Sequence, residues 1–156
     1  MIPDQNKSSE FGFTLVELMI VLVVIAVVAS IATMSGLAAR VRANESIAQA
    51  SLKTISVGAE MFLNNAPVYP SNLATLGSNY IPSDLVTGQK SGYSFELKTG
   101  NSGATFTATA VPVSINYTGV KSYCISNLNA IYVYTNAPAL SADGTNCPAG
   151  GNILSG

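Results

Sequence analysis

The sequence of 156 residues contains no histidine and no tryptophan. Without histidine, the chain has no imidazole to act as a general base, to activate a nucleophile or to bind a metal ion. Charged residues make up only 10% of the chain, whereas an average soluble domain has about 25%. The formal net charge of −1 argues against the basic stripe that a nucleic-acid-binding protein requires. The composition therefore disfavours histidine-based catalysis and nucleic acid as a direct partner.

Cysteine is also scarce. The two cysteines, Cys124 and Cys147, lie in a region, residues 67–156, that is rich in Ser, Thr, Asn, Gly and Ala. This composition is typical of a secreted surface, and cysteines of exported proteins commonly pair. We therefore predict a Cys124–Cys147 disulfide, and the alternative is two separate buried thiols.

A long apolar run near the N-terminus is the most prominent feature that is present. No charged residue occurs from Leu18 to Ala39, and about 20 residues are enough to cross a hydrocarbon core of roughly 30 Å. The apolar region of a secretory signal peptide is shorter, about 7–15 residues, although the string VVASIA imitates a signal cleavage site. We interpret the run as a membrane-spanning helix. Glu17, directly before it, is not explained by a plain membrane anchor, because a carboxylate in that setting costs free energy.

The helical periodicity continues beyond the apolar run, and Pro67 ends it. We therefore predict one helix over about 13–65, apolar on all sides at 13–36 and amphipathic at 37–66. The amphipathic half must pack on another element, most simply the C-terminal domain. Its apolar stripe comprises Leu37, Val41, Ala48, Leu52, Ile55, Ala59 and Phe62.

Residues 67–156 have the pattern of a small globular sheet domain. Residues 67–92 are punctuated by Pro, Gly and Asn, and we predict an ordered loop with a helical turn at 71–76, capped by Ser71. The fold class is then α+β, with the long helix packed on a four-stranded antiparallel sheet and the disulfide closing the C-terminal loop. Alternation of apolar and polar residues predicts the strands, in two hairpins, at 93–99, 104–113, 121–127 and 130–136.

The string GFTLVELMIVLVVIAVVA, residues 12–29, closely resembles the N-terminus of type IV pilins and type II secretion pseudopilins. The resemblance implies a leader peptide at 1–12, cleavage between Gly12 and Phe13 by a prepilin peptidase, and N-methylation of Phe13. It makes Glu17 the fifth residue of the mature chain, where the family keeps its glutamate. A buried carboxylate costs much less when it is paired with a cation. Glu17 would therefore set the assembly register by meeting the amine of a neighbouring subunit.

The resemblance has departures. The leader MIPDQNKSSEFG contains Lys7 but also Asp4 and Glu10, whereas the family prefers leaders with a net positive charge. Many members have a proline near the position of Met34, and here any loosening of the helix would centre on the Ser35–Gly36 pair. Arg40 and Arg42 follow the span on its exported side, and in a filament we expect them to face acidic groups of neighbours.

The resemblance also implies a function and a location. The first hypothesis is a subunit of a type IV pilus, most similar to a type IVa major pilin, which polymerises for adhesion, motility or DNA uptake. The alternatives are a major pseudopilin of type II secretion and, from another class, a membrane-anchored extracytoplasmic binding domain. The implied partners are the inner membrane before assembly, the assembly machinery and further copies in a helical filament on the cell surface. The sheet region, from residue 92 onward, is also similar to that of major pilins and pseudopilins.

Chemistry beyond assembly has little support in the sequence. Carboxylates are scattered, and we expect no enzyme activity and no cofactor. Some major pseudopilins bind calcium in their C-terminal loop, and calcium prefers six to eight oxygen ligands. Here only Asp143, Asn146 and backbone carbonyls are available for that role, and a solvated turn is the interpretation that we favour.

Overall fold

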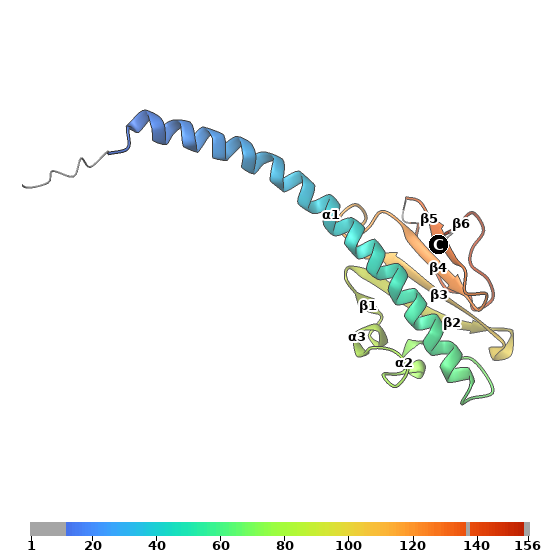
Figure 1. Cartoon of the computed structure of the whole chain (residues 1–156). Helices are drawn as coiled ribbons and strands as arrows, with labels where there is room; N and C mark the ends of the chain where they lie inside the picture. Colours follow the sequence, from blue (N-terminus) through green and yellow to red (C-terminus); the bar gives the residue numbers. More distant parts are fainter. Residues whose placement is uncertain (1–11, 137, 155–156) are drawn as a thin grey trace, which may run out of the picture. The chain divides into compact units, whose positions relative to one another are not determined.

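The computed structural model describes residues 12–136 and 138–154, with the backbone alone at 32–35. The chain divides after Gly36 into two compact units, residues 1–36 and 37–156. The predicted α+β class is confirmed, with a long N-terminal helix and an antiparallel sheet (Figure 1).

The long helix α1 spans Leu15–Leu63, 49 residues, within two residues of the predicted ends. Its end is capped locally, because the Asn65 side-chain amide donates to the Met61 carbonyl at 3.1 Å and so binds a carbonyl that has no partner inside the helix. Within the described residues, α1 is the one helix that is long and apolar enough to cross a membrane. Length and composition alone support that statement.

The second unit contains a six-stranded antiparallel meander in the order β1-β2-β3-β4-β5-β6. The four central strands match the four predicted ones. The two edge strands were not predicted, because two residues are too few to show an alternating pattern. The bounds are β1 Gln89–Lys90, β2 Tyr93–Gly100, β3 Thr105–Pro112, β4 Ser122–Ser126, β5 Ile131–Tyr134 and β6 Asn152–Ile153, with a 3-10 turn η1 at Asn101–Gly103 between β2 and β3.

Two short helices precede the sheet, α2 at Leu73–Leu76 and α3 at Ser83–Val86. The predicted cap was wrong by one residue: the Thr75 N–H donates to Asn72 Oδ1 at 2.8 Å, so Asn72 caps α2 and not Ser71. The helix α3 was missed altogether, because a single turn after Pro82 has no periodicity to detect. Both helices contribute buried leucines to the core.

The core of the second unit lies between α1 and one face of the sheet, and Figure 1 shows the C-terminal half of α1 running across that face. Leu37 lies outside the core with 45% of its surface exposed, and Phe62 is half-buried against Tyr80. The rest of the predicted stripe is buried, and those of its residues that pack in the core cluster are Ala48, Leu52, Ile55 and Ala59.

The opposite face of the sheet is covered too. Thr107 and Thr109 of β3, which alternation assigns to the outer face, are at most 1% exposed. The C-terminal loop, residues 138–150, covers them: the Gly144 N–H donates to Thr107 Oγ1 at 2.8 Å, and the Cys124–Cys147 disulfide fastens the loop to β4. The predicted disulfide-closed loop is therefore confirmed, and it is the second layer over the sheet.

Candidate processing and assembly site

Helix α1 begins with a side-chain cap. The Glu17 N–H donates to Thr14 Oγ1 at 3.2 Å, and the Leu18 N–H donates to the Thr14 carbonyl at 3.2 Å. Thr14 is therefore the N-cap and Glu17 the third helical residue, which is the spacing of a capping box. A carboxylate in the first turn is also favoured by the positive end of the helix dipole. The sequence carried this signal as Thr-x-x-Glu, but its capping role was not predicted.

The bond between Gly12 and Phe13 lies just outside the helix. Residues 12–14 have no regular secondary structure, and both Gly12 and Phe13 are exposed. Apart from its chain neighbours, no atom of the described residues lies within 4 Å of the position that a Cβ on Gly12 would occupy. The Gly12–Phe13 bond therefore lies in an exposed, non-helical segment directly before the helix that contains Glu17.

The first half of α1 is apolar and uncovered within its own unit. Every large apolar side chain that the structure describes from Phe13 to Ile31 has at least 46% of its surface exposed. The single serine of this run, Ser30, donates its hydroxyl to the Val27 carbonyl at 2.7 Å, so its polar group is satisfied inside the helix. An apolar surface of this size requires lipid or other apolar helices around it.

In the second unit, two polar residues of α1 fasten the loop between β3 and β4, residues 113–121, which we call the β3–β4 loop. Asn44 Nδ2 donates to the Thr118 carbonyl at 3.0 Å, and Glu45 Oε1 accepts from the Val120 N–H at 3.0 Å. Lys121 Nζ lies 4.0 Å from the other Glu45 oxygen. Sequence reasoning missed these contacts, because they join residues that are more than 70 positions apart.

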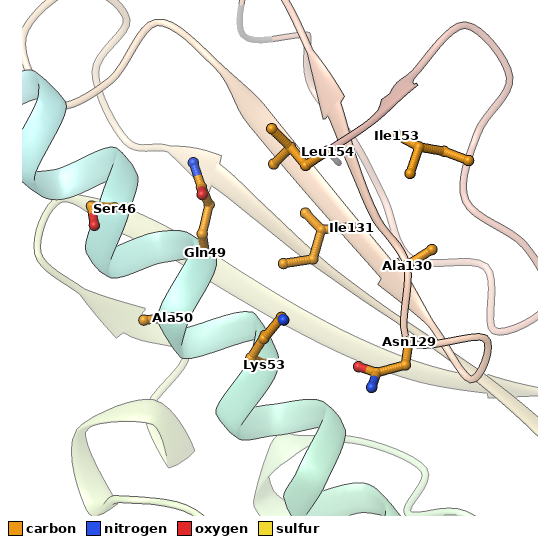
Figure 2. A pocket seen from close by; sticks show the side chains of 9 residues that line it. All are labelled: Ser46, Gln49, Ala50, Lys53, Asn129, Ala130, Ile131, Ile153 and Leu154. Atoms are coloured by element: carbon orange, nitrogen blue, oxygen red, sulfur yellow. The ribbon is translucent and has the colours of Figure 1, made fainter. Parts of the chain in front are cut away.

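A groove of about 440 Å³ lies between α1 and the β5–β6 edge of the sheet (Figure 2). Among the described residues that line the groove, Lys53 is the only ionisable one, so those residues offer no acid–base pair of the kind that general acid–base catalysis uses. The lining residues are Ser46, Gln49, Ala50, Lys53, Asn129, Ala130, Ile131, Ile153 and Leu154.

Asp143, the calcium candidate, caps a turn. Its Oδ1 accepts from the Thr145 N–H at 2.8 Å and from the Asn146 N–H at 3.1 Å. These hydrogen bonds, the one from Thr145 first, hold the pKa of the Asp143 carboxyl below its usual range. Among the residues that the structure describes, no three His, Cys, Asp or Glu side chains form a group that could hold a metal ion.

One comparison with known proteins gives a match. The family model of the prokaryotic N-terminal methylation motif matches residues 7–33. No curated protein and no solved structure matches the chain. The matched stretch contains the Gly12–Phe13 bond, the Thr14–Glu17 cap and most of the uncovered half of α1, and this half precedes a disulfide-closed α+β domain. The chain therefore carries a prepilin-type N-terminal methylation motif, and this motif supports a prepilin-like protein of the type IV pilin and pseudopilin family.

Proposed function

We propose that this chain is the pilin of an extracellular type IV pilus, a structural subunit that polymerises through the first half of α1. In this proposal the peptidase cleaves between Gly12 and Phe13, Phe13 is N-methylated, and the mature chain stays in the inner membrane until it is assembled. The observation that carries the proposal is the apolar first half of α1, whose described side chains have no cover within their own unit. Lipid covers such a surface before assembly, and neighbouring helices cover it in a filament.

The proposed role of Glu17 follows from the cost of burying charge. Cleavage creates a positively charged amine on Phe13, four positions before Glu17 along the chain. Inside a filament of packed aliphatic helices, Glu17 is tolerated where it meets such an amine and is costly elsewhere. A subunit that enters in the wrong register leaves its carboxylate unpaired, so Glu17 selects the correct register.

Isolation of the polymer tests the proposal. Fibres sheared from the cell surface are examined by electron microscopy, and the N-terminus of their subunit is sequenced by mass spectrometry. We expect long fibres built mainly of a chain that starts at methylated Phe13. A processed chain found only in short periplasmic filaments of a secretion system would support the pseudopilin alternative instead. A chain that keeps Met1 and stays a membrane monomer would support an anchored binding domain, for which the groove of Figure 2 is the available surface.

Substitution of Glu17 tests its role. For Glu17→Ala we expect normal membrane insertion and cleavage, with fibre yield reduced roughly tenfold or more, because breaking a buried ion pair costs about 3–5 kcal/mol at each contact. Ser30→Ala is the matched control, since it removes a polar group from the same half of α1 without changing its charge. Normal fibre yield from Glu17→Ala would refute the register role and leave the family assignment intact.

A further inference from the structure

The β3–β4 loop exposes several large apolar side chains. Val113 is 62% exposed, Ile115 51%, Tyr117 68% and Val120 37%. Four such residues within one short loop are unusual on a soluble surface, where apolar side chains are normally scattered singly. We call these four residues the loop patch.

The loop patch belongs to an ordered loop. Thr118 Oγ1 accepts from the Ser114 N–H at 3.0 Å and donates to the Ser114 carbonyl at 3.0 Å. The Asn116 N–H donates to the Gly119 carbonyl at 3.0 Å. Gly119 packs so closely on the Tyr93 hydroxyl that a Cβ there would collide with it. The apolar side chains are therefore held outward by a fixed backbone, and they meet a partner without paying the cost of ordering the loop.

The loop patch lies beside the N-terminal part of the second unit. The loop is fastened to α1 at Asn44 and Glu45, within the same unit. The uncharged run ends at Ala39, so the anchoring residues follow it after about 8 Å of helix at 1.5 Å per residue. The residues that hold the loop therefore lie in the first turns of α1 after the uncharged run.

Basic residues stand beside the loop patch. Arg40 and Arg42 precede Asn44 and Glu45 by four and three positions, so each shares a helix face with a residue that holds the loop. Both arginines are exposed, and within the described part of the chain neither forms an ion pair. Lys121 is a third cation beside the loop patch. Glu45 is the anion of this group, and its carboxylate accepts a hydrogen bond from the Val120 N–H. The group of three cations and one anion has a net positive charge.

We propose that the loop patch, with Arg40 and Arg42, is a membrane-surface contact that seats the second unit of the unassembled subunit on an anionic bilayer. Tyrosine at the interface, short apolar side chains and flanking arginines are the composition of interfacial contacts. Arginines near an anionic surface each contribute to binding. The contact rests on the membrane residence of the unassembled chain that the proposed function requires, and it disappears when the subunit leaves the bilayer for the filament.

The absence of tryptophan from the chain makes a sharp test possible. Tyr117→Trp places a single fluorescent reporter in the loop patch and keeps an aromatic residue at the interface. Leu128→Trp is the matched control, because Leu128 is as exposed, 72% against 68% for Tyr117, but follows the opposite end of β4. Each full-length variant is reconstituted in vesicles with anionic lipid, and quenching of its emission by brominated lipid is measured. Val24→Trp, inside the span, reports whether the chain is inserted.

We expect lipid quenching of Trp at position 117 and none at position 128. Adding Arg40→Gln or Arg42→Gln to the Tyr117→Trp chain is expected to lower the ratio of quenched to unquenched emission about fivefold for each arginine replaced, as is expected for a charge near an anionic surface. In vesicles without anionic lipid, we expect weaker quenching of the Tyr117→Trp chain, and we expect the arginine substitutions to have no further effect.

Three outcomes would overturn the proposal. If Trp at position 24 is quenched and Trp at position 117 is not, the chain is anchored and the loop patch does not touch lipid. If Trp at position 117 has blue-shifted emission that lipid does not quench and that disappears when the protein is diluted in lipid, the loop patch contacts a second copy. If Trp at position 24 is also unquenched, membrane residence itself fails, and with it the proposed function.

Discussion

The two halves of α1 belong to one helix and have opposite surroundings. From Leu15 to Ile31, every large apolar side chain is exposed. From Ala48 to Ala59, a stripe that includes Leu52 and Ile55 is buried against the sheet. Both halves satisfy the backbone in the same way, so the backbone does not distinguish them. What distinguishes them is whether the same chain supplies a cover, since burial and not helix formation provides most of the stability of a helix.

The polar residues of the two halves of α1 also differ, in where their hydrogen-bond partners lie. In the first half, polar groups bond back to the helix itself, as Ser30 does with Val27. In the second half, Asn44, Glu45 and Glu60 bond to loops and side chains far along the sequence, as when Tyr69 donates its hydroxyl to Glu60 Oε1 at 2.8 Å. The first half is therefore adapted to any apolar environment, and the second half to one specific partner.

The largest expected effect comes from truncating one leucine in each half. Leu52→Ala should lower the free energy of unfolding of the sheet domain by about 2–5 kcal/mol, because it leaves a cavity at a residue with 0% exposure. Leu22→Ala, at a leucine that is 58% exposed, should leave that free energy unchanged. Denaturant unfolding of the full chain in detergent, followed by near-UV circular dichroism, measures both. Equal effects of the two substitutions would mean that the halves are not independent.

Alanine substitutions at two glycines of α1, Gly58 and Gly36, should have smaller effects on stability, and these two effects should be opposite in sign. A Cβ on Gly58 would lie 2.8 Å from Ile81 Cγ2 and 2.9 Å from the Tyr80 carbonyl oxygen, so Gly58→Ala should destabilise the domain by about 1–3 kcal/mol through overpacking. Apart from its chain neighbours and the backbone of α1 itself, Gly36 has no described atom within 4 Å of that position. Gly36→Ala should therefore stabilise the helix, by up to about 1 kcal/mol. Helix content and thermal unfolding of both variants check the two signs, and a destabilising Gly36→Ala would contradict the absence of a close neighbour.

The smallest expected effect is that of low pH on the C-terminal loop, which covers the outer face of the sheet. Burial acts to raise the pKa of Glu96, but its hydrogen bonds with Lys98, the Ala142 N–H and the Ser141 hydroxyl outweigh it and lower that pKa. Because the folded-state pKa is depressed, the stabilisation is present above the unfolded-state pKa of about 4.3 and is lost as pH falls through the folded-state value. Acid should therefore loosen the C-terminal loop before it affects either half of α1.

Amide hydrogen exchange at Ala142 measures this loosening. Below about pH 4, the ratio of the Ala142 exchange rate in the parent to that in Glu96→Gln should rise toward one, whereas near pH 6 the parent should be the better protected. The ratio cancels the ordinary pH dependence of exchange. Protection at Ala142 that is equal in both proteins at pH 6 would show that the Glu96 hydrogen bond does not hold the loop.

The fold was predictable where the signals are local or periodic. The ends of α1 were predicted within two residues, because the helical periodicity is continuous between them and Pro67 ends it. The strands β2 to β5 were predicted from alternation. The edge strands, α3 and the cap at Asn72 were not, because each depends on one or two residues whose role is fixed by contacts. At the N-terminus, the residues singled out for cleavage, methylation and register remain predictions, and Thr14 was the omission.

The sequence by itself determined which segment is uniformly apolar and where the central strands lie, because these properties depend on composition and on neighbours within a few positions. Only the tertiary structure decided that β3 is buried on both faces, since the cover comes from Gly144 and the disulfide, far along the chain. It also decided that the β3–β4 loop is fastened to α1 beside Arg40 and Arg42. Contacts between distant residues depend on how the elements pack, and no local pattern contains that information.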